Sequence, residues 1–564
     1  MDTETYDYVI VGAGSAGCVL AHRLTEEPEV RVLLLEAGGT DWDPLIHIPL
    51  GVGRIWKKRL HDWGYDTEPE PNLNHRRIEM LRGKVLGGSS SINAMAHIRG
   101  HRGDYERWAR SGLSGWSYAN LEPYFKRTET WQYGPAPHRG SSGPIKVRYT
   151  NRDDPLAWAM LEAARAAAIP VFDDVNSGAP EGFGLSQCTI DRGRRASAAV
   201  AFLRPARGRS NLTVKTRGLA SRILFEGKTA VGVEYVTGGV AHRARAEREL
   251  ILSCGALNTP QLLMLSGIGN AEHLRSLGIG PMLHLPGVGA NLQDHLSVNV
   301  EHWRLGKTPL KHTLRADRIA VAMIRAYFTG KGPGTQLPGG FTATVRTRTD
   351  LGAPDLQFLY RGGALNARPW LPFVGPDWRD AFSLRPVLLH PESRGHVFLA
   401  SADPRGKIRI QPNFLSAPND LATLRDGVRI ARTVLRQRVL DPHRGEEIAP
   451  GPQCTSEEDI DAFIRATAVT VHHPSCTCRM GQDELAVVDP ELRVRGIDRL
   501  RVVDASVMPD LVSGNINACV LMIAERASDL IRGRPPLPPE PIGAAQPAWP
   551  AEKIVRDGEQ NHEL

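Results

Sequence analysis

Cysteine is scarce in this sequence: there are seven in 564 residues, an odd number spread along the chain. This spacing shows no disulfide framework and favours a reducing compartment. Long apolar runs are also missing, because no stretch reaches eighteen apolar residues, so we expect no transmembrane helix. The N-terminus lacks the basic and apolar regions of a signal peptide. We therefore expect a cytoplasmic protein, with peripheral attachment to the inner membrane as the alternative.

A strong excess of one charge is missing as well. Lys and Arg number 69 and Asp and Glu number 62, which leaves a formal net charge of +7. A nucleic-acid-binding protein would need its positive charge concentrated on one face, so we expect no nucleic-acid partner. The composition, 41% hydrophobic and 23% charged, is that of a globular protein. This length predicts two to four domains of roughly 150 residues each.

The chain opens with a strand–helix–strand pattern. Apolar runs at Tyr6–Val11 and Arg31–Leu35 read as buried parallel strands, and Ser15–Leu24 has helical spacing. This pattern predicts a doubly wound α/β domain. Two later runs, Glu249–Ser253 and Leu500–Val503, look like strands of the same sheet, each followed by a helical stretch. We therefore expect this domain to be discontinuous in sequence.

A dinucleotide-binding fingerprint, Gly12-x-Gly14-x-x-Gly17, lies between the first strand and the first helix. Gly12 permits the tight turn, Gly14 lets the backbone approach a pyrophosphate, and Gly17 allows close helix–strand packing. The helix N-terminus offers free N–H groups to the phosphates. Glu36, at the end of the second strand, is placed to accept hydrogen bonds from a ribose. This unit predicts nucleotide binding and leaves NAD and FAD both open.

A second glycine-rich segment, Arg82–Asn93, holds three Gly and three Ser within twelve residues. Such a segment is unsuited to a core element. It suits a loop that wraps around a flat ligand, and it suits a flexible surface loop equally well.

Several motifs, taken in order, resemble the glucose–methanol–choline (GMC) family of FAD-dependent alcohol oxidoreductases. They are YDYVIVGAGSAGCVLAHRL with LLLEAGG near the start, RGKVLGGSSSINAM at 82–95, GALNTPQLLMLSGIG at 255–269, LPGVGANLQDH at 285–295, HHPSCTCRMG at 472–481 and RVVDASVMPDLVSGNINACVLMIAERASDLI at 501–531. The match spans nearly the whole chain and is weakest between about 300 and 460. It is most similar to bacterial choline-dehydrogenase-type and alcohol-dehydrogenase-type members. The family's commoner HPVGTC is replaced here by HPSCTC.

The resemblance implies an α/β fold with a discontinuous Rossmann-like FAD-binding domain and an α+β substrate-binding domain. We expect the FAD-binding domain at 1–155, 200–300 and 465–533, and the substrate-binding domain at 156–199 and 301–464. The Pro-rich tail, 534–564, should be extended or disordered.

The resemblance also implies a set of FAD contacts. The 82–95 loop would cradle the flavin and pyrophosphate, Val214 would meet the adenine through its backbone, and Asp504 would lie near the ribityl chain or pyrophosphate. Some members attach FAD covalently through a histidine where this chain has Ile92, so we expect non-covalent FAD. The full expected set is Gly12, Gly14, Ser15, Ala16, Gly17, Glu36, Ala37, Arg82, Gly83, Gly87, Gly88, Ser90, Asn93, Ala94, Met95, Ala96, Val214, Cys254, Asp504, Ala505, Asn517 and Ala518.

His473 and Asn515 fall where the family has its active-site pair. Oxidation of an alcohol needs a base poised near neutral pH, which suits histidine, while the flavin takes the hydride at N5. The resemblance implies His473 as the base and Asn515 as the group that orients the substrate oxygen. His472, in a strand, would point the opposite way and be a packed residue. Cys476 and Cys478, a Cys-x-Cys pair without a second pair, favour packing over a metal site.

The presumed substrate domain is basic. Between Glu301 and Glu392 there is no glutamate, and five aspartates stand against thirteen Lys or Arg, most of which we expect to be solvated. A choline site needs a carboxylate and an aromatic cage. We therefore expect a neutral or weakly anionic primary alcohol rather than choline. A further basic cluster, Arg192, Arg194 and Arg195, is expected to be a solvated face, with an acidic or lipid partner as the alternative.

The sequence thus predicts an FAD-dependent oxidation of a primary alcohol to its aldehyde. The electron acceptor is expected to be a quinone or another non-oxygen acceptor. The alternatives are a choline dehydrogenase, an oxygen-using alcohol oxidase, a lyase or photodecarboxylase on the same fold, and a flavin-binding scaffold without catalysis. The sequence indicates neither the oligomeric state nor the natural alcohol.

Overall fold

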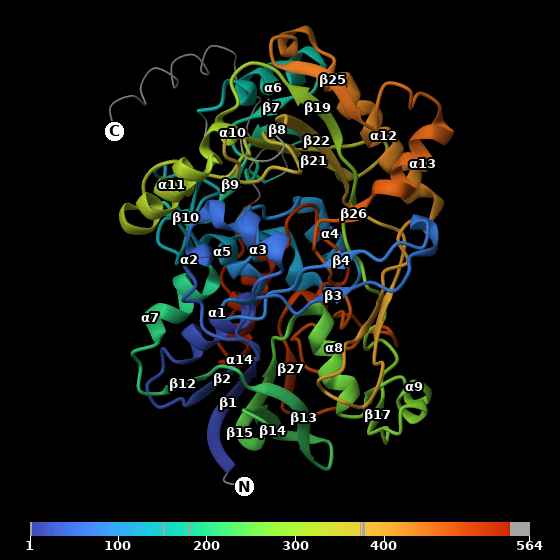
Figure 1. Cartoon of the computed structure of the whole chain (residues 1–564). Helices are drawn as coiled ribbons and strands as arrows, with labels where there is room; N and C mark the ends of the chain where they lie inside the picture. The colour runs from blue at the N-terminus through green and yellow to red at the C-terminus, as the bar shows by residue number, and fades with distance from the viewer. Residues whose placement is uncertain (1–2, 151–152, 179–180, 373, 375–377, 542–564) are drawn as a thin grey trace.

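A computed structural model describes residues 3–150, 153–178, 181–372, 374 and 378–541. Two large sheets dominate it, one in the lower half of Figure 1 and one in the upper half. In the described part of the chain, seven strands form the lower sheet, in the order β12-β2-β1-β15-β14-β13 with β27 paired to β15. Their bounds are β1 Thr3–Val11, β2 Val32–Leu35, β12 Leu212–Lys215, β13 Leu219–Glu226, β14 Thr229–Thr237, β15 Val240–Leu252 and β27 Leu500–Val502.

The lower sheet confirms the prediction of a discontinuous α/β domain, because its strands come from three separate stretches of chain. β12, β2, β1, β15 and β27 run parallel, and β14 and β13 add an antiparallel edge. Helices α1 (Ser15–Leu24), α8 (Gly255–Leu265) and α14 (Asn517–Ile531) follow β1, β15 and β27, near the expected bounds. Because the strands are parallel, their carboxyl ends share one edge, where ligands of such sheets bind.

The upper sheet is mainly antiparallel and contains nine strands among the described residues, in the order β25-β19-β22-β21-β20-β8-β7, with β18 paired to β22 and β26. Their bounds are β7 Val171–Phe172, β8 Gly182–Leu185, β18 Leu296–Ser297, β19 Val300–Arg304, β20 Phe341–Val345, β21 Leu356–Arg361, β22 Ala381–Leu388, β25 Arg444–Ala449 and β26 Val469–Thr470. Helices α6 (Pro155–Ala166) and α12 (Pro418–Leu435) pack against this sheet, and α13 (Glu457–Thr467) packs on α12.

The remaining α-helices and strands of the described residues lie in the connections between the strands of the two sheets. The helices are α2 Pro44–His47, α3 Val52–Lys58, α4 Arg102–Arg110, α5 Tyr118–Thr128, α7 Arg204–Ala206, α9 Ala271–Ser276, α10 Pro309–Thr313 and α11 Ala316–Thr329. The strands are β3 Tyr65–Asp66, β4 Glu79–Met80, β5 Glu129–Trp131, β6 Ile145–Tyr149, β9 Gln187–Cys188, β10 Ile190–Asp191, β11 Arg194–Arg195, β16 Ile268–Gly269, β17 Leu283–His284, β23 His396–Phe398 and β24 Arg409–Gln411. No helix in the described ranges is long and apolar enough to cross a bilayer.

The start of the Pro-rich tail is extended rather than disordered. Leu537 packs against the core of the lower sheet, and its N–H donates to the Tyr124 hydroxyl of α5 at 3.1 Å. The Glu540 N–H donates to the carbonyl of Ala119, also in α5. The rest of the tail, 542–564, lies outside the described residues.

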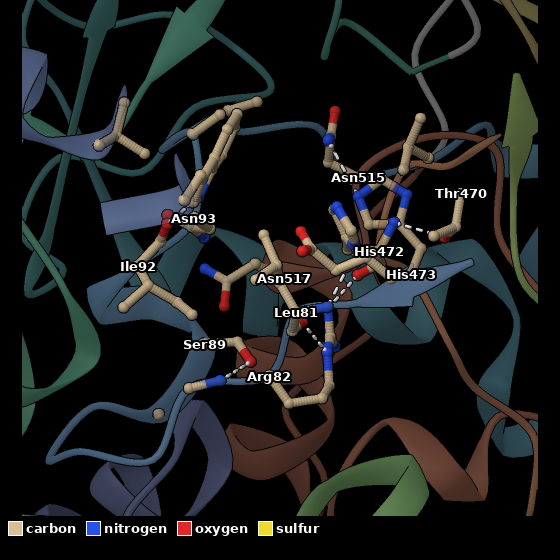
Figure 2. A pocket seen from close by; sticks show the side chains of 18 of the residues that line it. Leu81, Arg82, Ser89, Ile92, Asn93, Thr470, His472, His473, Asn515 and Asn517 are labelled. Carbon is tan, nitrogen blue, oxygen red and sulfur yellow. Dashed lines mark hydrogen bonds between the residues drawn. The ribbon is translucent and has the colours of Figure 1, made fainter. Parts of the chain in front are cut away.

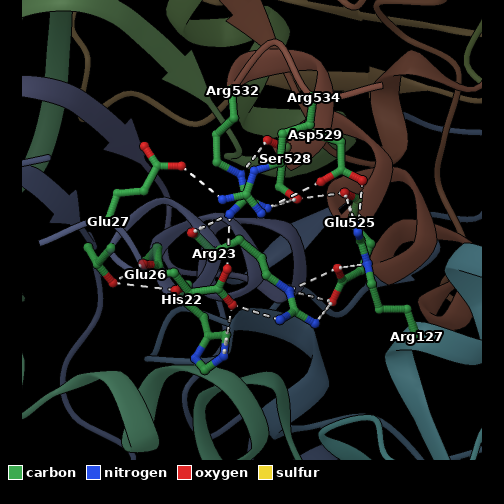
Figure 3. Close-up of polar contacts among 12 residues, drawn as sticks. His22, Arg23, Glu26, Glu27, Arg127, Glu525, Ser528, Asp529, Arg532 and Arg534 are labelled. Carbon is green, nitrogen blue, oxygen red and sulfur yellow. Dashed lines mark hydrogen bonds and ion pairs between the residues drawn. The ribbon is translucent and has the colours of Figure 1, made fainter. Parts of the chain in front are cut away.

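A buried ion cluster ties the two ends of the chain together (Figure 3). Glu525 on α14 is fully buried and accepts hydrogen bonds from the Arg23 guanidinium of α1, the shortest at 2.9 Å. The guanidinium of Arg127, on α5, lies 2.8 Å from the same carboxylate. Two positive groups therefore share one fully buried negative group, and each has a second carboxylate partner, Glu26 for Arg23 and Asp529 for Arg127.

Replacing Glu525 with glutamine should lower the free energy of unfolding by about 3 kcal/mol, because two guanidinium groups lose the fully buried carboxylate that they share. The measurement is urea unfolding followed by circular dichroism. Glu26→Gln is the matched control: Glu26 also pairs with Arg23 but is partly exposed, so its loss should cost less than about 1 kcal/mol. Equal losses in both variants would show that burial of Glu525 is not what matters.

Candidate active site

A cavity of about 1530 Å³ is lined by residues of both sheets. At its lower-sheet end, Gly12 and Gly17 have the turn and the close packing expected of them. Gly12 has φ +101°, and a Cβ on Gly17 would lie 1.9 Å from the Gly12 oxygen, so only glycine fits there. A Cβ on Gly88 would lie 2.8 Å from the Cα of Gly14, so the second glycine-rich segment touches the first.

Two helix N-termini meet at this end of the cavity. Neither α1 nor α14 has a side-chain cap at its start, so their first N–H groups and positive dipole ends are left for a ligand. The Ser15 hydroxyl donates to Asn517 Oδ1 at 2.7 Å, which joins the two helix starts. This arrangement suits phosphate oxygens.

Glu36 lies at the carboxyl end of β2 and lines the cavity, as expected. Its carboxylate accepts hydrogen bonds from the N–H of Ala13 at 2.9 Å and of Gly38 at 2.7 Å. Burial raises the pKa of Glu36 to about 7. Glu36 therefore fixes the turns at Ala13 and Gly38.

Arg195 corrects one expectation of the sequence analysis. Its side chain is 1% exposed and is not part of a solvated face. The guanidinium donates to the carbonyls of Ile46 at 2.8 Å and Asn93 at 2.6 Å, and to Asn93 Oδ1 at 2.8 Å. Arg195 thus holds the 82–95 loop in place, whereas Arg192 and Arg194 are exposed.

Most of the expected site residues line this one cavity. They are Gly12, Gly14, Ser15, Ala16, Glu36, Ala37, Arg82, Gly83, Gly88, Asn93, Ala94, Ala96, Cys254, His473, Asp504, Ala505, Asn515 and Asn517. Among the described residues, six expected ones do not line it: Gly17, Gly87, Ser90, Met95, Val214 and Ala518. Several of the six support those that do; Ser90, for example, donates to the Gly87 carbonyl at 2.6 Å and so closes the loop.

His473 and Asn515 lie next to each other at the cavity, far from one another in sequence (Figure 2). The Asn515 side-chain amide donates to His473 Nε2 at 3.1 Å. His473 Nδ1 lies 2.9 Å from Nδ1 of His295, a residue that the sequence analysis did not single out. The other ring nitrogen of His295 lies 3.0 Å from the carbonyl of Leu389.

These contacts assign the tautomers. A carbonyl can only accept, so His295 carries its proton on Nε2, and its Nδ1 accepts. The proton between the two Nδ1 atoms therefore belongs to His473. His473 Nε2 is left with a lone pair beside Asn515, which is the form a general base needs.

The surroundings keep this base neutral. Burial, followed by the influence of His295 and Arg82, holds the pKa of His473 well below its ordinary value. Burial likewise lowers the pKa of His295 to about 3, so His295 remains an acceptor at neutral pH. Asp294 Oδ1 accepts from the His473 backbone N–H at 2.7 Å and fixes the chain at that point.

His472 is not in a strand, contrary to expectation. Its φ is +66°, a left-handed conformation, and its side chain lines the cavity instead of pointing away. Its Nδ1 accepts from the Leu81 N–H at 3.3 Å, and its carbonyl accepts from Arg82, so this histidine is packed in place. Cys476 and Cys478 are buried, and the described residues show no group of three or more His, Cys, Asp or Glu able to hold a metal ion.

The comparisons with known proteins agree with this geometry. GMC oxidoreductase family models match residues 6–297 with the N-terminal model and 391–524 with the C-terminal model. The chain belongs to the GMC oxidoreductase family. Choline dehydrogenase, mitochondrial, of Homo sapiens is 45% identical over 548 residues, which is 95% of this chain and 91% of the human protein. The oxygen-dependent choline dehydrogenase of Staphylococcus xylosus is 43% identical over 559 residues, covering 96% of this chain and 97% of that protein.

Solved GMC structures share the fold of this GMC oxidoreductase. Pyridoxine 4-oxidase from Mesorbium loti superposes with a TM-score of 0.84 at 34% identity, covering 94% of this chain and 99% of that one. Formate oxidase from Aspergillus oryzae RIB40 gives 0.88 at 27% identity with the same coverage. The protein is an oxidoreductase acting on CH–OH groups, and its cofactor is FAD. The glycine contacts and the two open helix starts fit such a dinucleotide.

Proposed function

We propose that this GMC oxidoreductase oxidises a primary alcohol to an aldehyde. His473 Nε2 takes the hydroxyl proton, and Asn515 holds the substrate oxygen with its side-chain amide. The bound FAD supplies the hydride acceptor. The observation that carries the proposal is the unprotonated Nε2 of a buried histidine at the cavity, paired with Asn515.

We infer that the 82–95 loop, the fingerprint glycines and the starts of α1 and α14 hold the FAD. The Asp504 carboxylate accepts from the Gly255 N–H at 2.8 Å and the Thr259 hydroxyl at 2.6 Å, so it supports the start of α8 beside the cofactor. Ile92 faces the cavity with a side chain that has no nucleophilic atom, which supports non-covalent binding.

Choline is the second candidate substrate, because several relatives are named choline dehydrogenases. The cavity offers little to a quaternary ammonium group. Among the described lining residues, the carboxylates are Glu36, Glu79 and Asp504. The first and last accept backbone N–H groups at the nucleotide end, and Glu79 is exposed and lies 3.6 Å from Arg59. We therefore propose neutral or anionic primary alcohols, rather than choline, as the preferred substrates.

A quinone or another non-oxygen acceptor is proposed for reoxidation. Helix α11 supports this proposal: Ile319 and Met323 line the cavity, while Val321, Ile324 and Phe328 are exposed on its outer side. An apolar molecule approaching the cavity from this side meets apolar side chains.

One experiment tests both parts. The purified holoenzyme is mixed anaerobically with a panel of primary alcohols that includes choline, and bleaching of the flavin is followed. The reduced enzyme is then mixed with oxygen or with a quinone. We expect simple primary alcohols to bleach faster than choline, and the quinone to restore the colour faster than oxygen. Faster bleaching by choline would reverse the substrate assignment, and product formed without bleaching would indicate a lyase.

A further inference from the structure

One wall of the cavity is a sheet face whose polar groups the mechanism does not use. β21 and β22 are antiparallel, with Leu359 opposite Arg385 and Arg361 opposite Ser383. Residues paired across a sheet, and those two apart along a strand, share one face. All four of these residues line the cavity.

The opposite face of the same strands packs against α12. A Cβ on Gly427 of α12 would lie 2.7 Å from Pro386 and 3.2 Å from Leu356. Alternation along the strands therefore directs Arg361 and Arg385 away from this helix and toward the cavity.

Arg361 has no hydrogen-bond or ion-pair partner among the described residues. Arg361 is half-buried, and burial lowers the pKa of its guanidinium. Glu301 lies on the same face, opposite Ser383 on the other side of β22, yet no ion pair within 4 Å joins it to Arg361 in the described structure. A half-buried guanidinium on the cavity wall, without an ion pair among the described residues, is available to a ligand that carries a negative charge.

Arg385 is held from one side. Its Nε donates to the Ser297 hydroxyl at 2.8 Å, and its Nη2 donates to the Thr470 carbonyl at 3.3 Å. These are neutral acceptors, so the charge is not cancelled. Arg385 also helps to lower the pKa values of His472 and His473, which places its charge near the base.

We propose that Arg361 and Arg385 form a carboxylate-binding subsite, and that the natural substrate is a primary alcohol that carries a carboxylate group. Two guanidinium groups on one wall can donate hydrogen bonds to both oxygens of a carboxylate. The planar guanidinium group suits this because two of its N–H groups can donate side by side. The subsite lies in the same cavity as His473 Nε2, so one molecule presents its carbinol to the base and its carboxylate to the wall. This inference rests on the proposed oxidation of an alcohol and names the class of that alcohol.

The test compares two substrates of equal length and shape, 6-hydroxyhexanoate and 6-hydroxyhexanamide. The wild-type holoenzyme should prefer the acid by at least about tenfold in kcat/KM, because a site built for a charged partner rejects its neutral analogue. Arg361→Gln should lower the acid-to-amide ratio about 10- to 100-fold, mainly through KM of the acid, and Arg361→Lys should recover part of it. Arg348→Gln, which removes an exposed arginine of the same domain, is the matched control and should leave the ratio as it is.

A binding measurement separates this inference from the proposed function. Hexanoate, which cannot be oxidised at a carbinol, should raise the Tm of the wild-type holoenzyme more than hexanamide does, and Arg361→Gln should abolish the difference. If hexanoate stabilises but no alcohol is oxidised, the subsite stands and the proposed function fails. If acid and amide are oxidised equally and stabilise equally, the subsite is overturned while the oxidation stands. Should Arg361→Gln fail to fold, the wild-type comparison of acid with amide decides alone.

Discussion

Replacing His473 with alanine should slow reduction of the flavin by a primary alcohol about 10²- to 10⁴-fold, while the holoenzyme stays yellow. The loss is that of a positioned general base, which takes the hydroxyl proton as the hydride leaves. The substitution removes Nε2 of His473, whose lone pair accepts the proton. The contact between His473 and His295 is what keeps Nε2 unprotonated. Anaerobic stopped-flow mixing with a saturating alcohol measures the rate directly.

His312→Ala is the matched control, because His312 is an exposed histidine of α10. Its rate should equal that of the wild type. A colourless His473→Ala protein would assign His473 a structural role in cofactor binding. A yellow variant reduced at the wild-type rate would mean that another group is the base.

Replacing His295 with leucine should slow flavin reduction about tenfold to a hundredfold. His295 is not among the described residues that line the cavity and contacts His473 behind it, so we expect it to act as a positioning residue through His473. Without the Nδ1 acceptor, the His473 Nδ1 proton has no partner, and the ring is free to rotate or to take the other tautomer. A misplaced tautomer puts an N–H where the base needs a lone pair.

The conservative variant His295→Asn distinguishes positioning from packing. Its side-chain oxygen can accept near the place of Nδ1, so it should retain more activity than leucine despite its smaller volume. The pH profile is a second measure. Since burial holds the pKa of His473 low, the wild-type rate of flavin reduction should stay level as the pH falls through 6.5, whereas His295→Leu should alter the shape of that profile. If His295→Leu and His295→Asn had the same rate of flavin reduction and the same pH profile, the hydrogen bond from His473 to His295 would not be what positions the base.

Local signals made the nucleotide end predictable. The buried strands are unbroken apolar runs, and the glycines stand where the backbone takes conformations or contacts that a side chain forbids, as at Gly12 and Gly17. The partnership of His295 and His473 joins residues 178 positions apart. No sequence periodicity in either segment indicates this contact. The position of His295, directly after an aspartate in one of the matched motifs, could have drawn attention to it.

Arginines were the least predictable part of the site. A count of basic residues does not distinguish Arg361 and Arg385 from the other Lys and Arg of this region, most of which were expected to be solvated. The structure places both side chains on the cavity wall. The alternation of Leu356, Phe358 and Tyr360 with Gln357, Leu359 and Arg361 was visible in the sequence, but it does not tell which face meets a helix and which meets a ligand. Likewise, His472 adopts a left-handed turn that a strand-like reading of its segment could not indicate.

The hydrogen bond between Ser15 and Asn517 joins residues that are 502 positions apart in the chain. Asn515 lies two residues before Asn517. A ribosome therefore makes the second of these two helix starts long after the first. Nascent chains that stop short of α14 have the fingerprint glycines but lack the second helix start, including Asn517. We therefore expect loading with FAD to follow the synthesis of α14, and truncations that remove α14 to yield protein without activity.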